Sequence, residues 1–62
     1  MCEANAYLIK DGKESLIMES VDTVAPEEEG SWLLVSIFGE RKDVKARIRE
    51  MNLVEHRIVF EV

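Results

Sequence analysis

The stretch that decides the fold is ANAYLIKDGKESLIM, residues 4–18. An apolar run from Ala4 to Ile9 is followed by the polar residues Lys10 to Lys13, and a second apolar run closes the stretch from Ser15 to Met18. The polar segment contains Asp11-Gly12, and an Asp-Gly pair between two apolar runs is a strong signal for a tight β-turn. We therefore predict an antiparallel hairpin at the start of the chain.

Two further segments after this hairpin have clear signals. The chain continues in extended form over Val21 to Ala25, and Pro26 to Gly30 then brings a proline, three glutamates and a glycine, which is typical of an exposed loop. The most hydrophobic run, SWLLVSIF over Ser31 to Phe38, is bounded by glycine at both ends and predicts a central strand covered on both faces. Its two aromatic residues, Trp32 and Phe38, are expected in the core.

The segment from Glu40 to Met51 fits two kinds of secondary structure. In a strand, Val44, Ala46 and Ile48 point inward and the cationic residues between them point outward. In a helix, Val44, Ile48 and Met51 align at positions i, i+4 and i+7. Periodicity alone leaves both possibilities open.

The end of the chain predicts another hairpin. Apolar residues at Leu53-Val54 and from Ile58 to Val62 surround the polar segment Glu55-His56-Arg57. Five or six short strands at this spacing are typical of a small barrel, which removes most exposed sheet edges by closing on itself. We therefore expect an all-β single domain over residues 1–62, a small five- to six-stranded barrel of the SH3 or Sm kind.

The length of the chain predicts a partner subunit. A core formed by 62 residues rarely supplies more than about 3–5 kcal/mol of net stability without a disulfide, a metal or oligomerisation. The chain has one cysteine, so it cannot form an internal disulfide. Oligomerisation and a metal shared between chains remain, and we expect a homodimer.

Charge and composition exclude several classes of protein. The net charge of −5 opposes nonspecific binding to phosphate backbones and anionic lipid. The chain shows no signal peptide and no apolar run near the roughly 20 residues of a membrane span, so no membrane partner is expected. Together with the free thiol, these features predict a cytoplasmic protein.

Cys2 and His56 are the candidate metal ligands. Cys2 is either such a ligand or a small apolar residue at the start of the first strand. His56 follows Glu55 in the predicted last turn, where we favour a solvated imidazole over a ligand role. Met18 and Met51 lie in different segments and are interpreted as core residues, not as a thioether site.

A basic row offers an alternative function, namely an RNA-binding small barrel that uses the basic strand Arg41 to Arg49. Its members are Arg41, Lys45, Arg47 and Arg49. Asp43 interrupts the row, and single-strand binding also needs exposed aromatic residues, so we favour a solvated face and expect no nucleic acid partner. The sequence also lacks a glycine-rich phosphate-binding loop, a nucleophile elbow and a His-Cys-Asp arrangement, so we expect no enzyme activity.

Three stretches together resemble the CooT family of small nickel-binding proteins: Met1 to Leu8, the Asp11-Gly12 hairpin, and Ile37 to Lys42. The resemblance covers essentially the whole chain. It implies a homodimeric small β-barrel that binds Ni(II) through the amino-terminal cysteine and is linked, in some members, to nickel insertion into carbon monoxide dehydrogenase. It also favours a strand over a helix for Glu40 to Met51, and only Cys2 is carried over as a metal ligand.

The position of Cys2 suits nickel chemically. If Met1 is removed, the Cys2 amine and thiolate form a five-membered chelate ring with the metal, and two such chain ends provide an N2S2 set. If Met1 is retained, its amine, the Cys2 amide nitrogen and the thiolate form two fused chelate rings. Both arrangements can be planar, which Ni(II) and Cu(II) accept and Zn(II) does not prefer. We predict a nickel chaperone or storage protein that binds Ni(II) through Cys2 at a dimer interface and serves a carbon monoxide dehydrogenase-type client. A purely structural interaction module is a further alternative.

Overall fold

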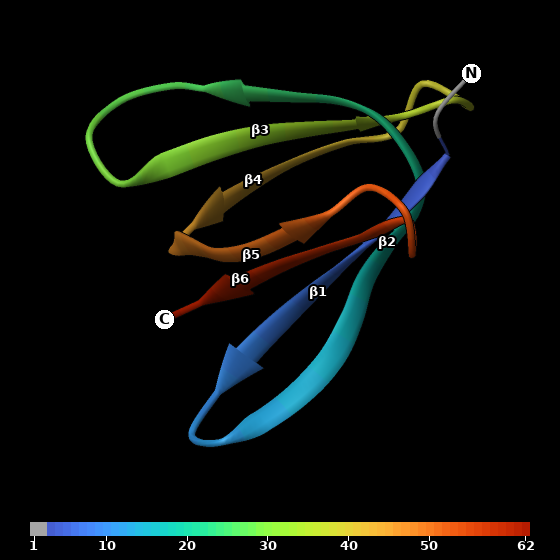
Figure 1. Cartoon of the computed structure of the whole chain (residues 1–62). Helices are drawn as coiled ribbons and strands as arrows, with labels where there is room; N and C mark the ends of the chain where they lie inside the picture. Colours follow the sequence, from blue (N-terminus) through green and yellow to red (C-terminus); the bar gives the residue numbers. More distant parts are fainter. Residues whose placement is uncertain (1–2) are drawn as a thin grey trace.

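The computed structural model describes residues 3–62, which form six β-strands and no helix (Figure 1). The strands are β1 (Ala4–Lys10), β2 (Lys13–Pro26), β3 (Ser31–Ser36), β4 (Arg41–Lys45), β5 (Arg47–Asn52) and β6 (Arg57–Glu61). They form one mixed sheet in the order β4-β3-β2-β1-β6-β5. The all-β prediction is confirmed. Among the described residues, no helix is available that could span a membrane.

The predicted first hairpin is present. β1 and β2 pair antiparallel up to Lys10 and Lys13, which face each other across the turn. Asp11 and Gly12 have φ angles of 54° and 75°, the left-handed conformation that a two-residue hairpin turn of this kind requires. The Asp-Gly pair therefore forms the turn that its chemistry predicts.

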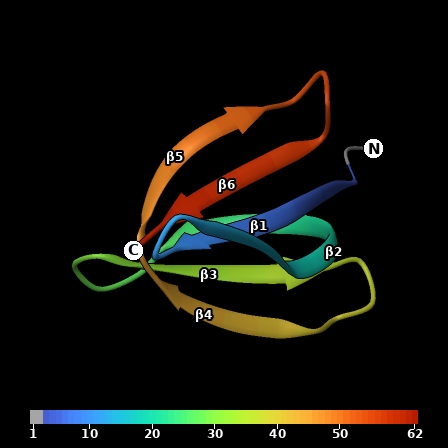
Figure 2. The same ribbon diagram turned by 90° about the horizontal axis from the view of Figure 1, so that it is seen from below.

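The long strand β2 bends in its middle. It has 14 residues and pairs first with β1 and then with β3. At the bend, Ser20 has a φ of 54°, and the register with β3 shifts between Val21 and Thr23. Figure 2 shows the result: β3 and β4 lie on one side of the molecule, and β1, β6 and β5 lie on the other.

The sheet does not close into the expected barrel. Its two edges are β4 and β5, which are consecutive in the chain but are not neighbours in the sheet. Only Ala46 separates them, and a single residue is too short for even the two-residue turn of a tight hairpin. The two strands therefore meet at a corner and diverge, and β5 pairs with β6 (Figure 1). The segment 40–51 is thus extended, as the family resemblance implies, but it forms two strands.

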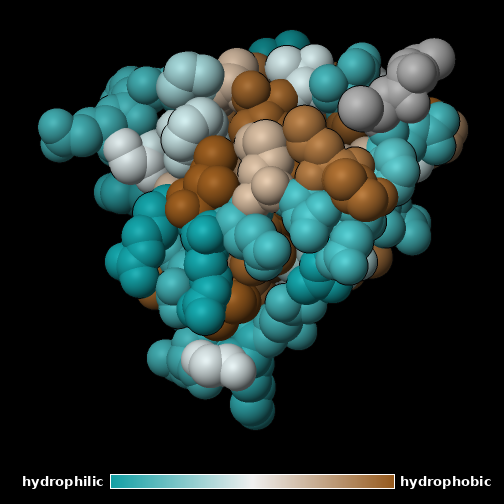
Figure 3. Space-filling view, viewed as in Figure 1, coloured by the Kyte–Doolittle hydropathy of each residue, from teal (hydrophilic) through white to brown (hydrophobic). Residues whose placement is uncertain are grey.

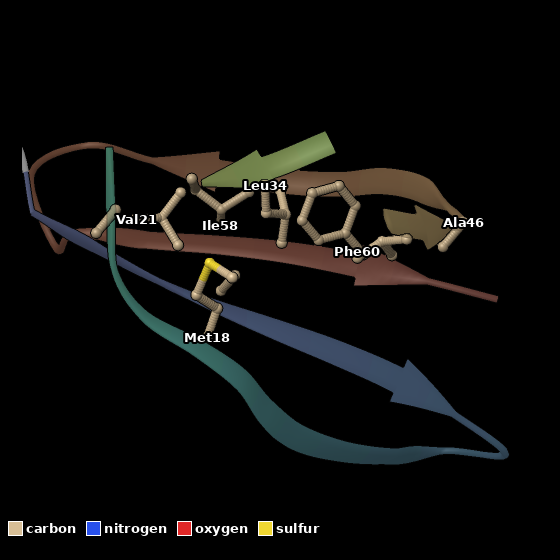
Figure 4. Packing of buried hydrophobic residues seen from close by; sticks show 9 residues of the cluster. Met18, Val21, Leu34, Ala46, Ile58 and Phe60 are labelled. Carbon is tan, nitrogen blue, oxygen red and sulfur yellow. The ribbon is translucent and has the colours of Figure 1, made fainter. Parts of the chain in front are cut away.

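The hydrophobic core lies between the two halves of the folded sheet. Phe60 and Leu34 are its largest fully buried side chains. Figure 4 shows them packed with residues from β2, the β4–β5 corner and β6, namely Met18, Val21, Ala46 and Ile58. Met18 is a core residue, as predicted.

Three predictions about the core are wrong in part. β3 lies next to the edge strand β4 and is buried mainly on one face, so it is not a central strand covered on both faces. Phe38 is 76% exposed, because β3 ends at Ser36 and the chain leaves the sheet there. Met51 is 46% exposed on the edge strand β5, whereas Trp32 packs against the core and is half-buried.

Candidate metal centre

The predicted nickel ligand Cys2 and its neighbour Met1 lie outside the described residues. The described chain begins at Glu3 and enters β1 at Ala4. The start of β1, the β3–β4 turn (residues 37–40) and the β5–β6 turn (residues 53–56) lie at the same end of the molecule in Figures 1 and 2. We call these three segments the amino end.

The start of β1 is held firmly by both of its neighbours. The Asn5 backbone N–H donates to the carbonyl oxygen of His56 at 2.9 Å. The Asn5 side chain oxygen Oδ1 accepts a hydrogen bond from the backbone N–H of Ser20 at 3.3 Å. Ala4 is buried, 4% exposed. The residues that directly follow the candidate ligand are therefore fixed in the sheet.

His56 lies beside the start of β1. It is exposed and has a φ of 57°, which agrees with the prediction of a solvated imidazole in a turn. Its carbonyl contact with Asn5 follows from the parallel pairing of β1 with β6, in which Asn5 faces Arg57. Nothing in the local sequence predicts this pairing, because it joins strands from opposite ends of the chain. The chain's only histidine thus lies at the amino end.

The β3–β4 turn is held by its own backbone hydrogen bonds and by one buried hydroxyl. Ser36 is 2% exposed, and its Oγ accepts the backbone N–H groups of Phe38 and Glu40 at 3.1 and 3.2 Å. The Ile37 N–H donates to the carbonyl of Ser20 at 2.9 Å, which joins the turn to the bend of β2. Gly39 has a φ of 87°, where a residue with a Cβ is strained. The Phe-Gly-Glu segment of the family resemblance is therefore an ordered turn.

Apolar side chains are exposed at the amino end. Phe38 and Ile37 are 76% and 37% exposed in the β3–β4 turn, and Leu53 and Val54 are 57% and 90% exposed in the β5–β6 turn. Figure 3 shows hydrophobic side chains gathered over β5 and the turn after it. The sequence does not indicate this surface, because its apolar residues also fit the buried faces of the strands predicted there. Clustered exposed apolar residues indicate an interaction surface.

The side chains of residues 3–62 do not form a coordination shell by themselves. Over this range, no group of three or more His, Cys, Asp or Glu side chains could hold a metal ion. A structural metal site normally has four protein ligands, and a planar Ni(II) site also has four donors. A metal ion bound at the amino end therefore needs donors from Cys2, from a second chain, or from both.

The basic row does not form one surface. Arg41 and Lys45 belong to β4, whereas Arg47 and Arg49 belong to β5 at the other edge of the sheet. Both β5 arginines pair with Glu61, each at 3.2 Å. The prediction of one basic strand from Arg41 to Arg49 is wrong, because the chain turns at Ala46 and half of its cations are matched by a carboxylate.

A second cluster of charge covers the sheet surface between β1, β2 and β6. The Arg57 guanidinium carbon lies 4.5 Å from the centre of the Tyr7 ring, and Arg57 donates to Glu14 at 3.0 Å. This hydrogen bond raises the pKa of Arg57 above its usual value. The three side chains tie neighbouring strands together and leave the Tyr7 ring covered by the guanidinium.

Comparison with known proteins gives the family. The family profile described as CO dehydrogenase accessory protein CooT matches residues 1–61. The chain belongs to the CooT family. A crystal structure assigned to CooT from Carboxydothermus hydrogenoformans is similar, with a TM-score of 0.87 and 50% sequence identity over 97% of this chain and 95% of that chain. A comparison with curated proteins gave no match.

Membership of the CooT family confirms the resemblance drawn from the sequence. The matched range includes Cys2 and the whole amino end. CooT is described as an accessory protein of CO dehydrogenase, so the family role is to assist that enzyme. Nickel binding and the dimer remain predictions for this chain.

Proposed function

We propose that this CooT protein binds Ni(II) through Cys2 at an interface between two copies of the chain and delivers the ion to a CO dehydrogenase-type enzyme. The observation that carries the proposal is the family match over residues 1–61, which includes the only cysteine. An accessory protein of a metalloenzyme with a single thiol at its second residue is well suited to handling a metal ion.

The chemistry of the ligand favours nickel. A thiolate binds metal, and an unperturbed thiol with a pKa of about 8.5 loses its proton when the metal binds. The nearby backbone nitrogen donors and the thiolate form five-membered chelate rings, which suit a planar ion such as Ni(II). Cu(II) binds similar donors more tightly, so selectivity in the cell depends on which metal is available.

Two chains are needed in this proposal. Each chain supplies one thiolate, and residues 3–62 offer no cluster of three ligating side chains that could complete the shell. The exposed apolar residues Phe38 and Val54 at the amino end supply surface that a second copy can cover.

Delivery requires that the ion can leave. A site made from two chain ends is open to the ligands of a client enzyme, which can replace the donors one at a time. A closed four-ligand cage, as in structural zinc sites, would hold the ion instead. The proposed arrangement therefore suits transfer better than storage.

The binding step is tested by titrating the protein with Ni(II) and following the absorption of the nickel thiolate bond. We expect saturation at one ion for two chains. Cys2→Ser should abolish this absorption and the associated rise in melting temperature, because ligand that binds only the native state stabilises it. His56→Gln is the control for a general loss of donors and should keep the thiolate band. Unchanged nickel affinity in Cys2→Ser would exclude the proposed ligand.

The delivery step needs a separate experiment. Nickel-loaded protein is added to nickel-free CO dehydrogenase in the presence of a chelator that removes free Ni(II). We expect the wild-type protein to restore activity and the Cys2→Ser variant to fail. Equal activation by both proteins would show that transfer does not pass through the thiolate.

A further inference from the structure

A groove lies at the end of the molecule opposite the amino end. It has a volume of about 410 Å³ and is formed by the β2–β3 loop (residues 27–30), the flanking strand ends and the β4–β5 corner at Ala46. In Figures 1 and 2 these segments lie on the far side of the molecule from the start of β1. The groove lies at the corner where β4 and β5 diverge, at the open side of the sheet.

The floor of the groove is largely apolar. Trp32 and Ile48 are half-buried and Ala46 is buried, so the indole and the isoleucine side chain are covered on one side and accessible on the other. Trp32 lies opposite Pro26 in the β2–β3 pairing and opposite Val44 in the β3–β4 pairing. Directly opposed residues share a face of the sheet, so the indole faces the same side as the buried Val44.

The wall of the groove is a closed, acidic loop. The Glu27 N–H donates to the Ser31 carbonyl at 3.1 Å, and the Ser31 N–H donates to the Glu28 carbonyl at 2.9 Å. These two bonds and the left-handed Gly30, with a φ of 79°, fix the loop backbone. Glu27, Glu28 and Glu29 are all exposed and line the groove. Hydrophilic side chains cover this projecting loop at the left of Figure 3.

The negative charge of this wall is poorly matched within the chain. Arg47 is the cation that lines the groove, and Glu61 already pairs with it at 3.2 Å. Asp43 adds a further carboxylate on the outer side of the loop, next to Glu27 and Glu28. Lys45 on β4 lies opposite Ser31, on the face of the sheet away from the indole. Arg41, also on β4, partly offsets the rise in the pKa of Glu27. The groove thus combines an accessible indole with several carboxylates.

We propose that this groove binds a lysine- or arginine-bearing extended segment of a partner protein. The aliphatic stem of such a residue packs on Trp32 and Ile48 while its charged end reaches the carboxylates of the loop. A cation over an indole face gains a further electrostatic attraction. Charge complementarity therefore selects a basic segment over an acidic or a purely apolar one.

The groove proposal is independent of nickel binding. The groove and the amino end lie at opposite ends of the molecule, so both can be occupied together. Asp43 raises the pKa of Glu27 above its ordinary value, through hydrogen bonding and repulsion between the two carboxyl groups.

Trp32 is the chain's only tryptophan, so its fluorescence reports on the groove directly. The probe is an acetylated, amidated pentapeptide in which lysine alternates with valine and leucine, and the control peptide has glutamine in place of each lysine. We expect the lysine peptide to change the Trp32 fluorescence in a saturable way and the glutamine peptide to have little effect. Equal binding of the two peptides would overturn the proposal.

A pair of charge-matched variants makes the test specific. Glu27→Gln/Glu28→Gln/Glu29→Gln removes the acidic wall, and Glu19→Gln/Glu50→Gln/Glu55→Gln removes as much charge from exposed positions elsewhere. We expect about a tenfold or greater loss of affinity in the first variant and less than about threefold in the second. An equal loss in both variants would show a nonspecific attraction and contradict the groove. A second result would also contradict the proposal: full displacement of the peptide by Ca²⁺ or Ni(II) alone in the Cys2→Ser variant. The groove would then be a site for inorganic cations.

Discussion

The two ends of the molecule differ in hydrogen bonding, in exposed apolar surface and in charge. At the amino end, the buried hydroxyl of Ser36 and the side chain of Asn5 accept backbone hydrogen bonds, and the turns expose apolar side chains such as Phe38. At the groove end, backbone hydrogen bonds close the loop, and the carboxylates of Glu27 and Asp43 line the same hollow. One end exposes apolar side chains, while the other gathers exposed carboxylates.

This difference indicates what each end is suited to bind. Uncovered apolar surface beside fixed turns suits another protein surface, such as a second copy of the chain. Carboxylates held close together reduce the stability of the free protein, and a cationic partner would relieve that cost. Binding sites often carry features that are unfavourable for folding. The two proposed contacts lie at opposite ends of the molecule, so one small domain could make both at the same time.

The largest expected effect comes from comparing the two phenylalanines. Phe60 is fully buried and Phe38 is 76% exposed. Phe60→Ala should lower the free energy of unfolding by about 3–5 kcal/mol, because it leaves a cavity in the core. Phe38→Ala should change it by no more than about 0.5 kcal/mol, as is usual for surface positions. Urea denaturation measures both, and a large loss in Phe38→Ala would mean that the amino end is part of the core.

A smaller difference in the free energy of unfolding is expected between variants of two serines, one at each end. Ser36→Ala removes the hydroxyl that accepts the N–H groups of Phe38 and Glu40, and each hydrogen bond lost costs about 0.5–1.5 kcal/mol. Ser31→Ala at the groove end should cost no more than about 0.5 kcal/mol, because Ser31 closes the loop through its backbone alone. Equal losses in the two variants, measured by urea denaturation, would remove the contrast between the ends.

The smallest effect concerns pH at the groove end. The hydrogen bond to Asp43, followed by burial and repulsion, raises the pKa of Glu27 above its ordinary value of 4.5. The folded protein therefore holds this proton more tightly than the unfolded chain, and the resulting stabilisation is complete below pH 4.5 and is lost as pH rises through the folded pKa.

Glu27→Gln imitates the protonated carboxyl and should raise the urea midpoint slightly at pH 7. The difference from wild type should shrink toward pH 4. Glu50→Gln, at an exposed position on β5, is the control and should show no such trend. A lower midpoint for Glu27→Gln at pH 7 would mean that the carboxylate is favourably placed and that the groove end is not under electrostatic strain.

The local parts of the fold could be predicted from the sequence, and the long-range parts could not. Asp11-Gly12 fixes its hairpin through backbone preferences of two adjacent residues, and the loop at Pro26 follows from proline, glycine and charge. The barrel prediction failed because closure depends on whether β4 and β5 can pair, and the one-residue corner at Ala46 decides this.

For the candidate site, the sequence indicates a ligand, Cys2, and that role remains a prediction. Cys2 stands out as the single cysteine, and the family match includes it. The position of His56 beside β1 depends on a parallel pairing between the first and last strands, and periodicity carries no information about such pairing. The exposure of Phe38 was missed because a hydrophobic run does not show where its strand ends; here the turn begins after Ser36.

The central claim is that one Ni(II) ion joins two chains through Cys2, and native mass spectrometry measures it most directly. With added Ni(II), the wild-type protein should appear as two chains with one nickel ion, and the chain mass also shows whether Met1 is present. The Cys2→Ser variant should bind no nickel under the same conditions, while His56→Gln should keep the wild-type pattern. A nickel-bound single chain in the wild-type protein, or nickel retained by Cys2→Ser, would contradict the account.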